Sequence, residues 1–430
     1  MAYLGVRISN WRPPSAYVVS PLLVSVVAGE TVGIVLAGGG ARGAYEVGAL
    51  SVLLPYLERR GERPRVFVGT SVGALTSSYL AARAHEPAQR VVDGGCRLWS
   101  EMTFEQVLEP VVSLRALAKI VRYLGQFLGV PGIRIESLLD PAPLRDTVRR
   151  VVCFGQLERN LAAGALEQAA VVATSALTSR SVVFHRGGAS PAADPARGID
   201  YVGTEQTAEQ VCASAAIPGV FPAVHVAAPA RAGGWYYDGG ARLNTPIKPA
   251  LELGAERVVV IAAHSIAAGP DQLAGERPPD ALEGAGQIVQ ALLVDPLVHD
   301  VRTLATVNRI VHEAGGDREA GSAAGKRSVP YIFVAPRRRH QVGELAMLVF
   351  RAHYKRVKHA LRSPDLALLG RIVAGGSDPL HGDLLSYLLF APEFARALIE
   401  LGRRDAERWL AQPHDDGPWQ LGPLPPDVPL

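Results

Sequence analysis

Apolar runs of strand length, each followed by a glycine, recur in the first part of the chain. Thr31–Ala37 and Val66–Val68 are rich in β-branched residues and end at glycines, so we predict buried strands there. Between them, Ala44–Glu58 carries apolar residues at helical spacing and is predicted to form an amphipathic helix. A strand, a helix and a second strand in this order predict a parallel sheet with a right-handed crossover.

The same pattern extends the predicted sheet and adds helices after it. Further strands are predicted at Ala169–Leu177, Ser181–His185, Arg257–Ala262 and Val329–Val334. Helical signals dominate residues 85–165 and 343–411, the latter with a break at Gly375-Gly376. Ile288–Val311 is predicted to be helical as well. Its common apolar face comprises Leu292, Val301, Leu304 and Ile310.

Changes in composition divide the chain into four parts. Residues 1–30 form a loosely structured lead-in, and residues 31–263 hold most of the predicted sheet as the core domain. Residues 264–411 form a helical region with one late strand, packed on that core. The tail at 412–430 is rich in proline and is expected to be disordered. Exposed loops are expected at Ala268–Gly286 and Gly315–Lys326.

Charge and cysteine content exclude several classes of function. The 430-residue chain has a formal net charge of +3, which argues neither for nor against a nucleic-acid partner. Because the chain has no basic arm with interleaved aromatic residues, we expect no nucleic-acid partner. Its three cysteines are Cys96, Cys153 and Cys212, and no C-x-x-C pair occurs. This argues against a disulfide framework or a zinc site and favours the reducing cytoplasm.

No apolar run reaches the length that crosses a membrane, so we expect no transmembrane helix. Val18–Ala28 is apolar and follows Arg7 and Arg12, as in a signal peptide. The run is short, however, and contains Pro21, and a long polar lead with Pro13-Pro14 precedes it. A signal peptide is therefore not favoured.

A serine stands at a sharp predicted turn between a strand and a helix. Gly69-Thr70-Ser71-Val72-Gly73 matches G-x-S-x-G directly after the predicted strand. Gly69 and Gly73 avoid crowding in a tight turn, and the start of the following helix favours negative charge beside the Ser71 hydroxyl. The pattern indicates a nucleophile elbow. The alternative is a serine that only caps a helix.

A second glycine-rich turn, Gly38-Gly39-Gly40-Ala41-Arg42-Gly43, follows the strand at Thr31–Ala37. It matches the G-x-G-x-x-G of dinucleotide sites, which also need an acid at the end of the second strand. Glu58 and Glu62 are near that spacing but precede the strand, and Ser71 stands at its end instead. The other interpretation is an oxyanion hole, in which backbone N–H groups stabilise a negative oxygen.

A nucleophilic serine needs a base, and the sequence offers two kinds. The usual partner is histidine. The candidates are His185, His225, His264, His299 and His340, and none stands in a distinctive local sequence. Asp238 precedes Gly239 and Gly240, so the backbone turns sharply and presents the carboxylate. A carboxylate within hydrogen-bond reach can take the serine proton directly. A turn without a chemical role is the alternative.

In chain order, the loop Gly38–Gly43, the elbow Gly69–Gly73 and Asp238-Gly239-Gly240 resemble the signature of the patatin-like phospholipase family. Ala213–Pro222 and Asp238–Pro246 are also similar to that family. The resemblance spans roughly residues 30–263, with weaker similarity in the C-terminal helices. It implies an α/β fold with three layers, α/β/α, around a mostly parallel central sheet, with additional C-terminal helices.

The resemblance also implies an activity. The protein is expected to be a serine lipid acyl hydrolase, a phospholipase A or carboxylic ester hydrolase, that acts on phospholipid or another acyl-ester lipid without a metal or cofactor. Ser71 would be the nucleophile and Asp238 the base, without a catalytic histidine. The oxyanion N–H groups would come from Gly38, Gly39 and Gly40. Arg42 and Gly43 complete the loop, Arg42 either holding it or meeting an anionic headgroup. Ala37 departs from the family's usual Asp or Gly and is expected to matter little.

Two other functions remain compatible with these residues: a histidine-dependent α/β-hydrolase, and a nucleotide-binding protein that uses Gly38–Gly43 without hydrolysis.

A lipid substrate would also bring the protein to a membrane surface. The densest basic stretches are Arg337-Arg338-Arg339-His340 and Arg351–His359, the second with Lys355, Arg356 and Lys358. Apolar residues between them are Leu345, Met347, Leu348, Val349 and Phe350. This region suits peripheral contact with anionic lipid, although a solvated helix face is the favoured interpretation.

Overall fold

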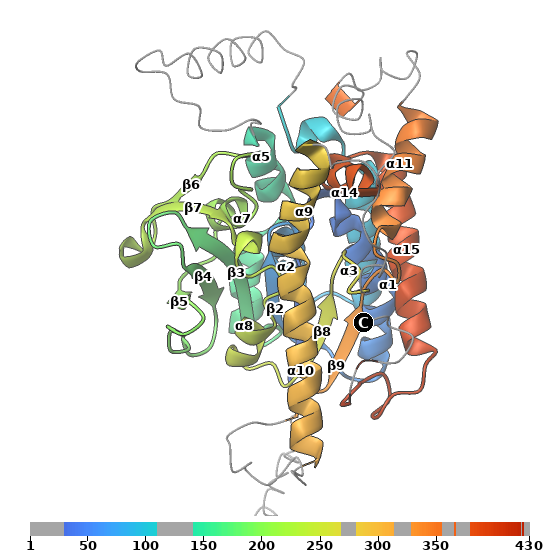
Figure 1. Cartoon of the computed structure of the whole chain (residues 1–430). Coiled ribbons are helices and arrows are strands. Elements are labelled where there is room, and N and C mark those ends of the chain that lie inside the picture. The colour runs from blue at the N-terminus through green and yellow to red at the C-terminus, as the bar shows by residue number, and fades with distance from the viewer. Residues whose placement is uncertain are drawn as a thin grey trace, which may run out of the picture.

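The computed structural model of the chain describes residues 30–109, 141–267, 281–313, 328–354, 365–366, 379–422 and 424. Within these ranges, one nine-stranded sheet packs among helices (Figure 1). The strands are β1 (Val32–Leu36), β2 (Pro64–Thr70), β3 (Gln168–Ser175), β4 (Ser181–Arg186), β5 (Ile199–Gly203), β6 (Val224–Val226), β7 (Gly234–Asp238), β8 (Arg257–Ile261) and β9 (Tyr331–Val334).

The helices alternate with these strands and then close the chain. They are α1 (Gly43–Arg59), α2 (Val72–Ala82), α3 (Ala88–Glu101), α5 (Ala142–Val151), α6 (Phe154–Ala162), α7 (Ala208–Ser214), α8 (Ile247–Glu252), α9 (Ala281–Leu293), α10 (Asp295–Glu313), α11 (Gln341–His353), α14 (Pro379–Leu388) and α15 (Pro392–Leu410). All of the strands predicted from the sequence are present. The short strands β5, β6 and β7 were not predicted, since none of them carries a run of β-branched residues.

The main path of the sheet is β5-β4-β3-β2-β1-β8-β9. Neighbours along it are parallel except β3 and β4, which are antiparallel. β7 pairs antiparallel with the end of β3 and carries β6 on its other edge. The mostly parallel sheet expected from the sequence is therefore confirmed.

Helices cover both faces of this sheet. All residues of β1 are buried, and because successive side chains of a strand point to opposite faces, neither face of β1 meets solvent. α2 packs against β1, β2 and β3, and α8 packs against β1, β2 and β8. Figure 1 shows α10 in front of the strands, and α1 beside α15. The expected α/β/α layering is confirmed.

The C-terminal helices and the sheet share one core. A Cβ on Gly48 would collide with the carbonyl of Ile399, and one on Gly402 with the carbonyl of Tyr45, so these glycines let α1 and α15 pack backbone to backbone. Tyr45 also donates a hydrogen bond to Asp405 on α15 at 2.9 Å. β9 continues the sheet beside β8. The division into a core ending at residue 263 and a following region stays a prediction.

Two predictions for the segment after β8 were wrong in part. Helix α9 begins at Ala281, inside the predicted loop Ala268–Gly286, because alanine, leucine and glutamine favour helix strongly enough to accommodate two glycines. The predicted helix at Ile288–Val311 is two helices, since α10 starts anew before Pro296. Val301 and Leu304 are buried as expected, but Ile310 is 56% exposed.

The tail was also wrongly expected to be disordered throughout. Trp419 is fully buried, and Gln420 exchanges backbone hydrogen bonds with Tyr331 at the start of β9. The Trp409 indole donates to the carbonyl of Pro418 at 2.9 Å. One large aromatic side chain thus gives the segment after Gln412 enough apolar burial to pack against the sheet edge.

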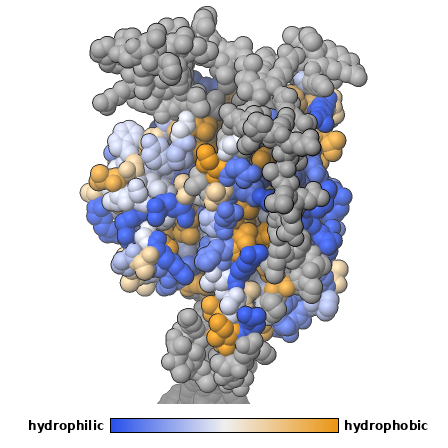
Figure 2. All heavy atoms as spheres, in the orientation of Figure 1, coloured by the Kyte–Doolittle hydropathy of each residue, from blue (hydrophilic) through white to orange (hydrophobic). Residues whose placement is uncertain are grey.

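The predicted membrane surface is only partly inside the described residues. Phe350 is buried on α11 and Leu348 is exposed, so the apolar surface expected from Leu345 to Phe350 is narrower than predicted. Residues 355–359, with Lys355, Arg356 and Lys358, lie outside the described residues, as do Gly315–Lys326, Gly375-Gly376 and the apolar run before residue 30. On the face shown in Figure 2, apolar residues occur in small groups between hydrophilic ones. Membrane contact therefore stays a prediction.

Candidate active site

Ser71 occupies the turn between β2 and α2. Its backbone has φ 55° and ψ −123°, a conformation that costs a non-glycine residue energy and that the surrounding packing must enforce. Gly69 and Gly73 make the turn possible. A Cβ on Gly69 would collide with the carbonyl of Gly73, and one on Gly73 would lie 2.5 Å from the carbonyl oxygen of Leu36. The turn places the Ser71 side chain at the carboxyl end of the sheet, beside the N-terminus of α2.

The sheet brings Asp238 to this serine. Asp238 ends β7, and its register partner on β3 is Ala173, one strand away from β2. Ser71 Oγ donates a hydrogen bond to Asp238 Oδ2 at 2.6 Å. Oδ1 of the same carboxylate accepts from the Gly240 N–H at 2.7 Å, which fixes the carboxylate plane. Only glycine fits at position 239, because a Cβ there would collide with the Val172 carbonyl.

The buried environment of Asp238 raises the pKa of its carboxyl group. Only 5% of its surface is exposed. Burial raises the pKa of Asp238 from its ordinary 3.8 to about 7, and the hydrogen bonds from Ser71 and Gly240 offset part of that rise. A carboxyl group with a pKa near neutrality can both accept and return a proton at physiological pH.

Ser214 holds the backbone of the turn at Ser71, a role that sequence reasoning missed. The Ser71 N–H donates to Ser214 Oγ at 2.8 Å, and Ser214 Oγ donates to the Val172 carbonyl at 2.5 Å. Ser214 ends α7 and is fully buried. It lies in Ala213–Pro222, which the sequence marked as similar to the family without giving any residue in it a role.

The glycine-rich loop differs from expectation at its first residue. The Gly38 N–H donates to Asn244 Oδ1 at 2.9 Å, so it is already engaged and does not point free toward a reacting oxygen. The N–H groups of Gly39 and Gly40 make no hydrogen bond to any described residue. Asn244 in turn donates to the Leu293 carbonyl at 2.9 Å. Asn244 is therefore a second supporting residue that only the fold reveals.

Arg42 and α14 hold the loop in place. Arg42 Nε donates to Ser386 Oγ at 2.7 Å, and Nη2 donates to the Asp383 carbonyl and carboxylate at 3.0 and 3.1 Å. The guanidinium lies 4.2 Å from the centre of the Tyr387 ring. Of the two roles predicted for Arg42, the structure supports holding the loop; with 4% exposure, its charge does not face a headgroup at the surface. Gly43 packs closely, since a Cβ there would lie 2.5 Å from Val72 Cγ2.

An apolar cavity opens beside Ser71. The space in and around it that no atom fills is about 580 Å³, part of which is open to solvent. Gly40 and Ser71 form its polar end. Its apolar wall includes Leu75, Trp99, Met102, Val148, Phe221 and Phe390. A long hydrocarbon chain matches this lining, whereas a charged or sugar-like group would leave its polar atoms without partners.

The residues that the two alternative functions would need make other contacts in the structure. Glu58 bonds to the Ala88 N–H and to Arg63, and Glu62 pairs with Arg60, so neither acid lies where a ribose would need it. Among the described residues, Ser71 Oγ hydrogen-bonds to Asp238 and to no histidine. His264 packs behind Gly39.

Three further observations concern the whole described part of the chain. No group of three or more His, Cys, Asp or Glu side chains in the described ranges is arranged to hold a metal ion. No helix in those ranges is both long and apolar enough to cross a membrane. Cys96, Cys153 and Cys212 are free thiols.

The chain was compared with curated proteins and with solved structures. No curated protein matches the sequence. Among solved structures, the chain is similar to VipD from Legionella pneumophila at 16% sequence identity and a TM-score of 0.29, with 71% of this chain and 61% of that chain covered. The chain thus spans less than two thirds of that protein, and the similarity is too weak to support a shared activity.

A match to a family model is stronger evidence than this structural similarity. The patatin-like phospholipase model matches residues 34–251, just over half of the 430-residue chain. The matched range contains the glycine-rich loop, the elbow with Ser71, Ser214, Asp238 and Asn244. This protein belongs to the patatin-like phospholipase family.

Proposed function

We propose that the protein hydrolyses acyl esters of lipids, with Ser71 as nucleophile and Asp238 as its base. The observation that carries the proposal is the 2.6 Å hydrogen bond from Ser71 Oγ to Asp238 Oδ2, at the polar end of an apolar cavity. A carboxylate within hydrogen-bond reach of a serine hydroxyl is the geometry that direct proton transfer requires. The cavity accounts for an acyl chain as the group to be bound.

The first half of the reaction forms an acyl-serine. Ionised Asp238 accepts the proton of Ser71 Oγ while Oγ attacks the ester carbonyl carbon. The N–H groups of Gly39 and Gly40 donate hydrogen bonds to the resulting oxyanion, and the N-terminus of α2 adds favourable partial charge. The tetrahedral intermediate collapses, the carbon–oxygen bond to the alcohol breaks, and protonated Asp238 returns the proton to the departing alkoxide.

The second half regenerates the enzyme. A water molecule gives a proton to Asp238 and attacks the acyl-serine carbonyl, and the same N–H groups hold the second oxyanion. Collapse breaks the bond to Ser71 Oγ, which takes back the proton, and the fatty acid leaves. A single group suffices for all four proton transfers because the pKa of Asp238 is near 7.

A fluorophosphonate probe tests the proposal directly, because it phosphonylates an activated serine. The purified chain should be labelled, Ser71→Ala should not, and Asp238→Asn should be labelled far more slowly. Hydrolysis of phospholipid vesicles and of a soluble ester should follow the same order. Labelling that persists in Ser71→Ala would assign the reactivity to another residue and sink the proposal.

A further inference from the structure

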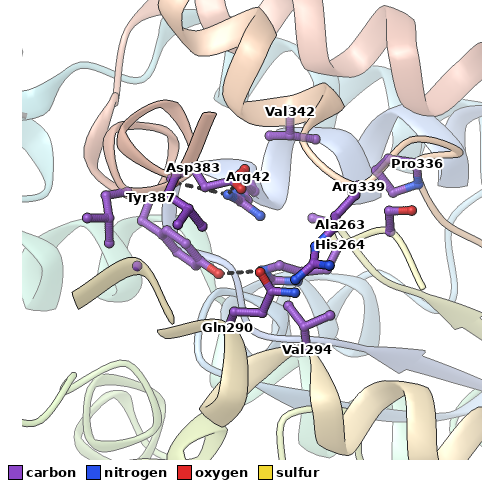
Figure 3. Close-up of a pocket in the computed structure, with 14 residues that line it drawn as sticks. Arg42, Ala263, His264, Gln290, Val294, Pro336, Arg339, Val342, Asp383 and Tyr387 are labelled. Carbon is purple, nitrogen blue, oxygen red and sulfur yellow. Dashed lines mark hydrogen bonds and ion pairs between the residues drawn. The ribbon is translucent and has the colours of Figure 1, made fainter. Parts of the chain in front are cut away.

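A second cavity lies behind the glycine-rich loop and takes no part in the proposed reaction. It lies between the end of β8, α9, the turn before α11, and α14, and the space there that no atom fills, including some open to solvent, is about 470 Å³. Figure 3 shows Arg42 and Asp383 on one side of it, and Gln290, Arg339 and His264 on the other. Tyr387 reaches across toward His264 and is also part of the wall of the acyl cavity.

A buried histidine in this cavity lacks one hydrogen-bond partner. His264 is 3% exposed, and its Nε2 lies 2.5 Å from the Tyr387 hydroxyl. Among the described residues, that hydroxyl has no other acceptor, so we assign it as the donor to Nε2. The ring proton then lies on Nδ1, which has no partner. Burial, and then the Arg42 charge, lowers the pKa of His264 well below its usual 6.5, so the ring is neutral.

An arginine in the same cavity is also incompletely partnered. Arg339 Nε is buried and makes no hydrogen bond, and no ion pair involves Arg339 within the described part of the chain. Arg42, by contrast, is neutralised by Asp383. The cavity wall thus holds two guanidinium groups and one carboxylate, which leaves one positive charge without a partner. Buried donors without acceptors are costly, and an arginine fork matches the oxygens of a phosphate or carboxylate.

We propose that this cavity binds a small oxyanion, a phosphate or carboxylate group, between His264 Nδ1 and Arg339. A water molecule would satisfy the two donors, whereas an anion would also pair with the charge of the half-buried Arg339. The Gln290 amide adds a third polar group to the same wall (Figure 3). The occupant is distinct from the acyl chain, because the apolar cavity beside Ser71 offers no such donors.

Occupancy of this cavity acts on the proposed oxyanion hole through shared contacts. A Cβ on Gly39 would lie 3.8 Å from His264 Cε1, so the ring packs directly behind that glycine. Gly40 packs against the Tyr387 carbonyl, and Arg42 stacks on the Tyr387 ring. An anion that fixes His264, and through it Tyr387, therefore holds the N–H groups of Gly39 and Gly40 in place. This coupling rests on the proposed function, whereas the binding itself does not.

Inorganic phosphate is the probe for binding. Thermal unfolding of the full chain should shift upward by about 2–4 °C in phosphate, relative to chloride at equal ionic strength. Arg339→Gln should lose the shift, and Arg338→Gln is the matched control, because Arg338 is exposed and pairs with Glu344 instead. Ser71→Ala should keep the shift, which separates this proposal from the catalytic one. No shift, or an equal shift in Arg339→Gln, means water or an adventitious ion only, and overturns the proposal.

Hydrolysis of a soluble neutral ester tests the coupling and the source of the anion. Phosphate should raise kcat with the same half-saturation as the thermal shift, and an unchanged kcat despite that shift would overturn the coupling. If the natural occupant is a substrate headgroup, Arg339→Gln should raise KM about ten-fold for a phospholipid but not for a diacylglycerol, and free phosphate should compete. If it is a free anion, both lipids should respond alike.

Discussion

The Ser71 hydroxyl and the Asp238 carboxylate lie 2.6 Å apart although 167 residues separate them in the chain. The carboxylate is buried, and its pKa of about 7 makes its protonation state change within the physiological range. Its ionised form is the base in the proposed reaction. kcat/KM should therefore rise with pH through about 7 and level off above it. A rate profile on a soluble ester between pH 5 and 9 measures this, and a flat profile would contradict it.

Replacing Asp238 by Asn should lower kcat by about 10²–10⁴-fold, because general-base catalysis by one group contributes that much. The amide keeps the shape of the side chain and can still accept from the Gly240 N–H. Residual activity should lose its dependence on pH near 7. A variant that retains more than a tenth of wild-type kcat would remove Asp238 from the role of base.

The same residue should make the fold less stable as pH rises. The folded-state pKa of Asp238 is about 7 and the ordinary value is 3.8, so the folded chain holds a proton that the unfolded chain has released between these pH values. This contribution is fully favourable below pH 4 and is lost as pH rises to 7, by at most about 4 kcal/mol. Asp238→Asn should therefore unfold at higher temperature than wild type at pH 8, and the gap should narrow at pH 5. Calorimetry at the two pH values measures it, and an equal gap at both would contradict the assignment.

Strain at the elbow gives a prediction that does not depend on turnover. Ser71 has φ 55°, where glycine is relaxed and other residues are not. Ser71→Gly and Ser71→Ala should both be inactive, but the glycine variant should be the more stable by about 1 kcal/mol in urea unfolding. Ser179 has the same φ on an exposed turn, so Ser179→Gly against Ser179→Ala is the matched control. If Ser179→Gly is more stable than Ser179→Ala but Ser71→Gly is no more stable than Ser71→Ala, the elbow is not strained.

Chain-length preference should follow the volume of the apolar cavity. Val148 on α5 is fully buried and contributes to the cavity wall. Val148→Phe fills part of that space, so kcat/KM should fall for long acyl esters and change little for butyrate esters. Each methylene that a hydrophobic pocket excludes lowers kcat/KM by about 10–200-fold. Val151→Phe, on the same helix but outside the cavity wall, should leave the profile unchanged. Equal losses for short and long esters would mean that the cavity does not hold the acyl chain.

What the sequence predicted well is local. The β1–α1–β2 unit follows from short-range apolar patterns, and the two turns after its strands follow from glycine, because only glycine fits where backbone carbonyls pack against the turn. The partner of Ser71 could be named because Asp238 stands in a tripeptide that forces a turn. These features need only a few neighbouring residues.

The rest depends on contacts between distant segments. Asn244 captures the Gly38 N–H, and Ser214 captures that of Ser71, across more than a hundred residues in each case. The local sequence around Asn244 or Ser214 contains no pattern that predicts such a contact. The tail was misjudged for the same reason, since its proline content suggests disorder until Trp419 is seen to be buried against the sheet. Arg42 was given two roles because its partner, α14, is a helix without a motif.

The packing of α14 on the glycine-rich loop gives the sharpest test of the oxyanion hole. Gly40 has φ 58°, and a Cβ there would collide with the Tyr387 carbonyl. Gly40→Ala should therefore displace the Gly40 N–H and lower kcat by about 10²–10³-fold, the usual cost of one lost oxyanion donor, with little change in KM. Gly61→Ala is the matched control, since Gly61 has φ 75° but open space around it. It should lose stability from strain alone and keep full activity. If Gly40→Ala loses no more activity than Gly61→Ala, the Gly40 N–H does not bind the oxyanion, and Gly39 would have to act alone.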